Sequence, residues 1–332
     1  MKLVTEFKRL NNFAKFAWLL VAYNVLVIVW GAFVRASKSG DGCGSHYPFC
    51  NGEVIPPSPT LATVIEFSHR LTTGLDGILV LIMLVWAFWV FKKGENVRLP
   101  AALSFVFIVT EGAIGAALVL FELVAENKSI ARAASMSAHL VNTLILLLFI
   151  ALTAWFASQP VDNRKINWRG NERRGVSLLF GLFLVALVGM SGAVAALGNT
   201  LYPGHELSEA LNQPNVPALT KAFVWLELWH PFLSIITAIY LIAVAQPLRS
   251  SRYAKPTRQF ATAALLLIGA QMIFGTLTLV LLAPVWMQLI HLLLAQLLWI
   301  ALVLLSAATL AEPKSARVPE RDFAPSQTSK IA

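Results

Sequence analysis

Four histidines lie inside long apolar segments of the sequence, each about five to nine residues from one end of its segment. They are His69, His139, His230 and His291, four of the six histidines in the 332-residue chain. An ionisable side chain is costly in lipid, so it normally faces the interior of a helix bundle and has a function. Imidazoles on facing helices are typical axial ligands of haem iron, whereas zinc is disfavoured because the segments contain no HExxH motif and no Cys/His cluster. We therefore expect haem ligation; for any one of these residues alone, the alternative is a buried imidazole bonded to a hydroxyl.

Glu66 precedes His69 by three residues, so both lie on one face of a helix. A carboxylate beside a bound macrocycle can accept protons from a substrate, which makes Glu66 a candidate catalytic acid/base. The alternative is an ion pair with Arg70 or Arg35. Glu227 repeats the same spacing before a later histidine. The spacing alone therefore does not tell which of the two carboxylates is catalytic.

Cys43 and Cys50 are the two cysteines of the chain and stand seven residues apart between apolar segments. If this loop faces an oxidising compartment, a disulfide is the simplest interpretation. Closing so short a loop contributes about 2.5 kcal/mol in the chain-entropy model. Two alternatives stay open, a copper or zinc site that includes His46 and a redox-active cysteine pair.

The elements that carry these residues are apolar enough to cross a membrane. Hydrophobic residues make up 57% of the chain and charged residues 13%, more apolar surface than one soluble core can bury. A transmembrane helix needs about 20 mostly apolar residues. Eight segments meet this requirement: 13–34, 62–91, 99–122, 133–157, 175–198, 221–245, 257–282 and 286–310. The sequence predicts an all-α integral membrane protein with eight transmembrane helices.

The positive charges indicate an orientation. Of the 26 Lys and Arg residues, 20 fall in the N-terminal segment, in alternate loops and in the C-terminal tail. Basic residues collect on the cytoplasmic side of a membrane, so we expect both termini to be cytoplasmic. The net charge of +9 is spread over these loops, which favours contact with membrane lipid and not nucleic-acid binding. The first segment has no signal-peptidase site and the N-terminus is unlike a mitochondrial transit peptide, so a bacterial plasma membrane is expected.

The chain repeats itself after about 160 residues. The repeat-related pairs are Gly31 and Gly192, Glu66 and Glu227, and His69 and His230, each 161 residues apart, Glu111 and Gln271, 160 apart, and His139 and His291, 152 apart. Because each copy has four segments, both copies run in the same direction through the membrane. The repeat divides the four histidines into two pairs.

We expect two pseudo-symmetric four-helix bundles, residues 1–160 and 161–312, followed by a disordered cytoplasmic tail, 313–332. The external loop 35–61 contains both cysteines and is longer than its counterpart, 199–220, which has none. Five glycines mark places where a ring or a helix could approach the backbone closely, with ordinary helix packing as the alternative. They are Gly74, Gly77, Gly112, Gly115 and Gly275.

Together, the EFSHR segment that contains Glu66 and His69, the three further histidines, the duplicated halves and the first-loop cysteines resemble the haem A synthase family over almost the whole chain. The resemblance implies that haem O is the substrate, bound by the N-terminal half near His69 and His139, and that its C8 methyl group is oxidised to formyl by successive hydroxylation. It also implies Glu66 as the essential acid/base and a resident haem b between His230 and His291. Cys43 and Cys50 would match a cysteine pair of many bacterial members.

The partners implied by the resemblance are haem O synthase as donor and an electron acceptor of unidentified class; a homo-oligomer stays open. The chain departs from some relatives because the 199–220 loop lacks a second cysteine pair, and Pro231 stands where a basic residue would mirror Arg70. A two-haem b-type electron-transfer protein that oxidises quinol is the main alternative. A transporter or haem-handling channel is a second one, disfavoured because the repeats are parallel.

Overall fold

The computed structural model describes residues 10–160, 165–201 and 218–312, without the side chains of 218–224, 226 and 227. The described residues form eight long helices, and one isolated β-bridge joins Cys50 to Glu53. The helices are α2 (Asn12–Ala36), α3 (Leu61–Val90), α4 (Arg98–Leu120), α5 (Ile130–Ser158), α6 (Glu172–Leu201), α8 (Ala218–Ala245), α9 (Lys255–Val280) and α10 (Val285–Ala311). A short 3₁₀ helix, η2 (Gln246–Arg249), follows α8. All eight helices are long and apolar enough to cross a membrane. The predicted fold class is confirmed.

Each predicted segment coincides with one helix and differs from it by at most three residues at either end. Side-chain caps explain several of the beginnings, because a polar side chain satisfies a free backbone N–H of the first turn. Asn11, Thr60 and Ser129 accept such hydrogen bonds at the starts of α2, α3 and α5. The 313–332 tail and most of the 199–220 loop lie outside the described residues.

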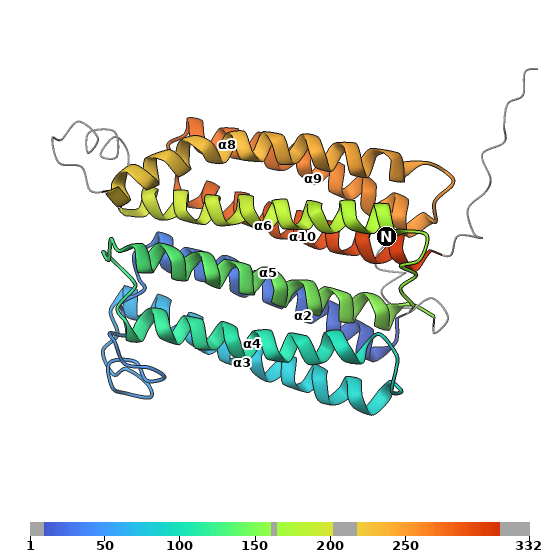
Figure 1. Cartoon of the computed structure of the whole chain (residues 1–332). Helices are drawn as coiled ribbons and strands as arrows, with labels where there is room; N and C mark the ends of the chain where they lie inside the picture. Colours follow the sequence, from blue (N-terminus) through green and yellow to red (C-terminus); the bar gives the residue numbers. More distant parts are fainter. Residues whose placement is uncertain (1–9, 161–164, 202–217, 313–332) are drawn as a thin grey trace, which may run out of the picture.

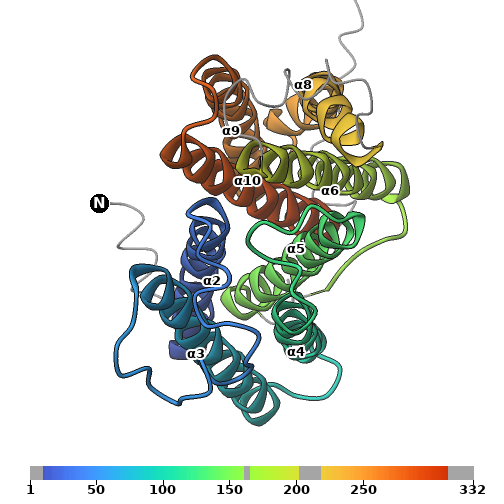
Figure 2. The same cartoon turned by 90° about the vertical axis from the view of Figure 1, so that its left-hand side faces the viewer.

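The helices form two groups of four that lie side by side (Figures 1 and 2). In the N-terminal bundle, α3 contacts α2 and α4, and α5 contacts α4 and α2. In the C-terminal bundle, α8 contacts α6 and α9, and α10 contacts α9 and α6. Each bundle is therefore a closed ring of consecutive helices, as the internal repeat predicts.

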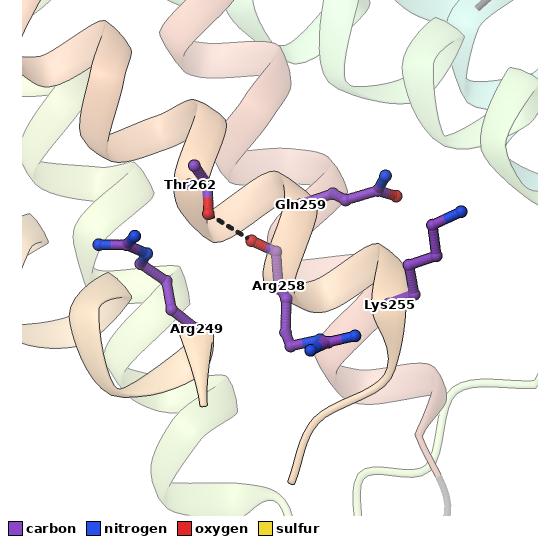
Figure 3. Close-up of a pocket in the computed structure, with 5 residues that line it drawn as sticks. All are labelled: Arg249, Lys255, Arg258, Gln259 and Thr262. Carbon is purple, nitrogen blue, oxygen red and sulfur yellow. Dashed lines mark hydrogen bonds between the residues drawn. The ribbon is translucent and has the colours of Figure 1, made fainter. Parts of the chain in front are cut away.

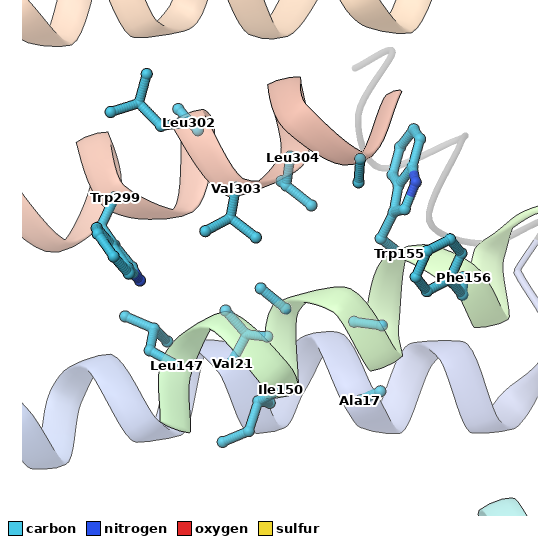
Figure 4. Packing of buried hydrophobic residues seen from close by; sticks show 14 of the residues in the cluster. Ala17, Val21, Leu147, Ile150, Trp155, Phe156, Trp299, Leu302, Val303 and Leu304 are labelled. Carbon is cyan, nitrogen blue, oxygen red and sulfur yellow. The ribbon is translucent and has the colours of Figure 1, made fainter. Parts of the chain in front are cut away.

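The two bundles pack through α2 and α5 on one side and α6 and α10 on the other. Figure 4 shows side chains of α2, α5 and α10 meeting here, with Leu147 of α5 and Val303 and Leu304 of α10 all buried. The indole N–H of Trp299 donates to the carbonyl of Leu144, 2.8 Å away across the interface. By contrast, large apolar side chains on α3, α4, α8 and α9 are exposed, as lipid-facing helices require: Val85, Trp89, Val106, Val109, Ile236, Ile239, Leu266 and Ile273.

The helix ends form two faces of different character. One carries the 37–60 loop and the short 121–129 connection, on the left in Figure 1, and we call it the loop end. The opposite end, which we call the basic end, carries Lys92, Lys93, Arg98, Arg169, Arg173, Arg174, Arg249, Arg252, Lys255 and Arg258. At the loop end Arg35 of α2 crosses to the other bundle, where its guanidinium donates to the carbonyl of Ala196 and the hydroxyl of Thr200, both at 2.7 Å. Arg35 is therefore a polar clamp between the bundles and not the partner of Glu66.

Candidate functional site

The four histidines lie in the half of their helices nearer the loop end, and all four are half-buried. Three of them lie against a glycine of a neighbouring helix. A Cβ atom added to Gly31 would come within 2.9 Å of the His69 ring, at Gly192 within 2.9 Å of His230, and at Gly275 within 3.0 Å of His291. These glycines are needed because any side chain there would displace the imidazole.

Of the five glycines singled out in the sequence, Gly275 alone is approached by an imidazole. At Gly74, Gly77, Gly112 and Gly115 no other residue's atoms lie within 4 Å of an added Cβ. No imidazole and no packed helix from the described part of this chain fills the space beside these four, so the approach of a bound macrocycle to them stays a prediction. Gly31 and Gly192, which also lie against histidine rings, are the first of the repeat-related pairs named above.

The repeat groups the histidines as His69 with His139 and His230 with His291. In each pair, the charge on one imidazole would disfavour the charge on the other, so the two rings are close enough to influence each other. Buried Nδ1 atoms of His69, His139 and His291 have no hydrogen-bond partner among the described residues, while Nδ1 of His230 lies 2.9 Å from the Ser191 hydroxyl. Paired imidazoles with ring nitrogens that the protein leaves unsatisfied are a donor set that fits haem iron. No group of three or more His, Cys, Asp or Glu residues in the described part of the chain is arranged to hold a bare metal ion.

Glu66 is buried on α3, only 4% exposed, and both of its oxygens are held. Oε1 accepts from the Arg70 guanidinium at 3.1 and 2.5 Å, and Oε2 accepts from the backbone N–H of Cys43 at 2.9 Å. The structure therefore contains the Arg70 ion pair considered in the sequence. That pair is compatible with proton transfer, because Oε2 accepts a single hydrogen bond and keeps a second lone pair. The side chain of Glu227 lies outside the described residues.

The 37–60 loop is fastened over Glu66 from several sides. Arg70 reaches out of α3 and donates to the backbone carbonyls of His46 and Phe49 at 2.6 and 2.7 Å. Near the start of α3, the backbone at Gly42 is so close that an added Cβ would lie 2.4 Å from the carbonyl group of Ala62. The loop therefore closes the loop end of the N-terminal bundle directly above the candidate acid/base.

Cys43 and Cys50 are joined by a disulfide and are completely buried. The predicted disulfide is confirmed. Both sulfur atoms are consumed in the bond, so they are not thiolate ligands for a metal beside His46. The backbone of Cys43 also donates the hydrogen bond to Glu66, which couples the disulfide-closed loop to the candidate catalytic residue.

A second carboxylate lies next to the N-terminal histidine pair. Oε1 of Glu111, on α4, is 3.5 Å from Nδ1 of His139, and Glu111 also contacts Asn142 and Thr143 of α5. Sequence reasoning did not assign Glu111 a role. The available signal was its place at the start of EGAIGAALVL, the segment repeated from Gln271.

A third polar pair lies deeper in the same bundle, towards the basic end. Asn24 of α2 donates to Oδ2 of Asp76 of α3 at 2.6 Å, and both side chains are at most 2% exposed. The repeat-related residues, by the 161-residue offset, are Val185 and Thr237. The N-terminal bundle therefore has a buried carboxylate at Asp76 and a partly buried one at Glu111, where the C-terminal bundle has Thr237 and Gln271.

A separate basic pocket of about 460 Å³ lies at the opposite end of the molecule. Figure 3 shows its lining residues, which come from η2 and the first two turns of α9: Arg249, Lys255, Arg258, Gln259 and Thr262. It contains none of the four histidines. Its charge fits the anionic surface of a membrane.

The fold and the paired histidines define a multi-pass membrane protein with a donor set suited to haem. A family model describing cytochrome oxidase assembly proteins, COX15-CtaA, matches residues 14–303. The chain belongs to this family.

Individual relatives have two different names. A protoheme IX farnesyltransferase of Thermus thermophilus is 42% identical over 300 residues, which are 90% of this chain and 49% of that protein. The heme A synthase of Halalkalibacterium halodurans is 37% identical over 146 residues, 44% of this chain and 48% of the relative. That of Geobacillus kaustophilus is 43% identical over 97 residues, 29% and 31% respectively. The chain thus spans about half the length, or less, of each of these relatives.

Proposed function

We propose that the protein is a haem A synthase, which oxidises the C8 methyl group of haem O to a formyl group. The observation that carries this proposal is the burial of Glu66, one turn from His69, under a disulfide-closed loop. A simple electron carrier has no need of a buried carboxylate under a closed loop beside one of its two histidine pairs. The COX15-CtaA match and the heme A synthase relatives support the same activity.

In the proposed reaction, the N-terminal bundle binds haem O as substrate between His69 and His139. Written with water as the oxygen source, the methyl carbon gains one oxygen and loses two hydrogens, and four protons and four electrons leave. Glu66 accepts protons released at this carbon, and Arg70 keeps its carboxylate oriented. The electrons pass to an acceptor outside the chain. The 37–60 loop separates the reacting group from bulk solvent, so that only the water molecules used in the reaction need to reach it.

The C-terminal bundle is proposed to hold haem b through His230 and His291. When bound, this haem supplies one-electron transfer. The chain contributes the ring positions: Gly192 and Gly275 accept the imidazoles, and Ser191 bonds Nδ1 of His230 and thereby fixes the ring. Pro231, directly after His230, cannot donate a hydrogen bond as Arg70 does, which suits a fixed cofactor and not a loop-covered substrate site.

We further propose a haem O synthase as the donor of the substrate. The Thermus relative is called a protoheme IX farnesyltransferase, and this chain matches only about half of its length. A single protein that both made haem O and oxidised it would be about twice as long as the part matched by this chain, as the Thermus relative is. Delivery between neighbouring membrane proteins would keep an insoluble haem out of water.

The proposal is tested by expressing the chain in a host that makes haem O but not haem A, beside a Glu66→Gln variant. Acid-acetone extracts are then analysed for haem A. We expect haem A with the unchanged chain and a loss of about 10²- to 10⁴-fold with the variant, which still binds haem. Two stable low-spin haems without any haem A would instead support the electron-transfer alternative.

A further inference from the structure

Glu111 occupies a built site inside the N-terminal bundle. The side-chain amide of Asn142 donates to its Oε2 at 2.6 Å and to the carbonyl of Phe107 at 2.9 Å, while Thr110 donates to the other side of Asn142 at 2.7 Å. Thr143 contacts Oε1. Asn142 is only 8% exposed and Thr143 6%. Neutral donors thus fix both oxygens of the carboxylate, and Oε1 also lies 3.5 Å from Nδ1 of His139.

The equivalent position of the C-terminal bundle also meets its histidine. Gln271 is the repeat mate of Glu111, and its side-chain amide lies 3.3 Å from Nε2 of His291. The residues that surround Glu111 are not repeated, however. Those at the positions of Thr110, Asn142 and Thr143 are Ala270, Leu294 and Ala295. Both bundles therefore place a side chain of this helix against a histidine. One bundle places a supported carboxylate at Nδ1 of His139, and the other places a neutral amide at Nε2 of His291.

A purely structural role does not explain this difference. A carboxylate is costly in a membrane, and the C-terminal bundle packs the corresponding region with a neutral amide and apolar side chains. In the described part of the chain, His139 is the one ionisable partner within 4 Å of the Glu111 carboxylate. The cost of the carboxylate is therefore balanced by an interaction with that imidazole and with the neutral donors.

We propose that Glu111 is a positioning residue for His139. Its carboxylate accepts a hydrogen bond from Nδ1 of His139, so that Nε2 faces the haem iron. The imidazole of His139 is then more electron-donating than that of His291. This inference rests on the proposed haem site. Nδ1 of His139 has no hydrogen-bond partner in the described chain, and it lies 3.5 Å from Oε1 of Glu111, the separation of a long contact that can tighten when a ligand binds. A carboxylate behind a ligating histidine fixes its orientation and increases its basicity. The chain then distinguishes its two haems by charge, favouring oxidised iron in the N-terminal bundle.

The test exchanges the two side chains between the bundles. Glu111→Gln copies the C-terminal bundle, and Gln271→Glu copies the N-terminal one. The purified proteins, loaded with haem, are titrated spectroelectrochemically and examined by electron paramagnetic resonance. We expect Glu111→Gln to change the ratio of oxidised to reduced haem in the N-terminal bundle about tenfold towards reduced. For a one-electron couple this is about 59 mV upwards. Gln271→Glu should shift the C-terminal haem downwards.

Unchanged potentials and g-values in a folded Glu111→Gln protein would overturn the inference. If Glu111→Gln does not fold, the Gln271→Glu variant alone decides. An unchanged reduction potential of its C-terminal haem would then overturn the inference. The outcomes separate the two proposals. A chain that makes haem A but has unshifted potentials refutes the role of Glu111 only. Shifted potentials in a chain that makes no haem A refute the proposed synthase activity only.

Discussion

Glu66 and Glu111 are both carboxylates beside the N-terminal histidine pair, but they are held in different ways. Glu66 is bound by a cation, Arg70, and by a backbone N–H of the loop. Glu111 is bound by neutral side chains of the adjacent helix. This difference suits two tasks, because the first carboxylate lies under a closing loop and the second behind a candidate iron ligand.

Replacing Arg70 by lysine should lower haem A formation about tenfold or more while haem remains bound. Lysine keeps the charge, but it lacks the planar fork that contacts Glu66 and the carbonyls of His46 and Phe49 together. The loop should also be cleaved faster by added protease. Arg98→Lys is the matched control, since Arg98 contacts the carbonyl of Phe88 at the basic end. Equal activity and equal cleavage in the two variants would contradict the role given to Arg70.

Sequence reasoning identified Glu66 but gave Glu111 no role, and the reason is geometric. Glu66 is three residues from its histidine, so helix periodicity alone brings them to one face. Glu111 lies on α4 and His139 on α5, and only helix packing shows that they meet. The glycines behave likewise, since Gly31 and His69 come from different helices. Contacts between helices could be predicted from the sequence only for residues that the internal repeat had already grouped together.

Among the elements, the 37–60 loop is the one that most clearly distinguishes the two bundles. It is closed by the disulfide, attached to α3 through Glu66 and Arg70, and linked to the 121–129 connection by the Lys38–Glu126 ion pair at 2.8 Å. The helices themselves were predictable, because their length and apolar composition follow directly from the membrane. The course of the loop could not be predicted from the sequence, because it depends on individual polar contacts.

Replacing both Cys43 and Cys50 by serine should destabilise the loop. The chain-entropy model gives about 2.5 kcal/mol for a loop of this length. We expect earlier thermal unfolding in detergent and lower haem A formation, because the Cys43 N–H then holds Glu66 less firmly. Treating the unchanged protein with a reductant should have the same effect and leave the double variant unaffected. A reductant effect of equal size on both proteins would contradict this explanation.

The Lys38–Glu126 pair should respond to acid. The hydrogen bond that Lys38 donates to Glu126 lowers the pKa of the Glu126 carboxyl below its ordinary value of 4.5. The pair therefore stabilises the folded loop above pH 4.5, and this contribution disappears as the pH falls through the lowered pKa. Exposed pairs contribute less than about 1 kcal/mol. The melting temperature of Glu126→Gln should thus be slightly lower than that of the unchanged protein at about pH 7 and equal to it near pH 3. A difference that persists in acid would rule out this origin.

On the scale of the whole molecule, the duplicated bundles share one interface but differ in their interiors. Arg35 joins them at the loop end, and Trp299 joins them in the apolar interior (Figure 4). In both bundles a histidine ring lies on a glycine of the first helix, Gly31 or Gly192. The two sites are thus placed alike by the repeat. Different residue types at repeat-related positions such as Glu111 and Gln271, together with the 37–60 loop, make them chemically different.

Trp299→Phe should lower the free energy of unfolding by about 1 kcal/mol, because the indole hydrogen bond to Leu144 is lost across the interface. Both haems should remain bound. Trp89→Phe is the control, since Trp89 is 87% exposed on the lipid-facing side of α3 and should tolerate the change. Thermal unfolding of both variants in the same detergent checks the prediction. Equal stability losses would contradict the importance of this contact.

The most direct test of two chemically distinct haem sites is mass analysis of the haems extracted from purified protein, expressed with a supply of haem O. The unchanged chain should contain haem b together with haem O or haem A. A His230→Ala/His291→Ala variant should lose haem b, and a His69→Ala/His139→Ala variant should keep haem b and lose the others. If the unchanged chain contained only haem b, or both variants lost the same haem, the division into a substrate site and a cofactor site would be wrong.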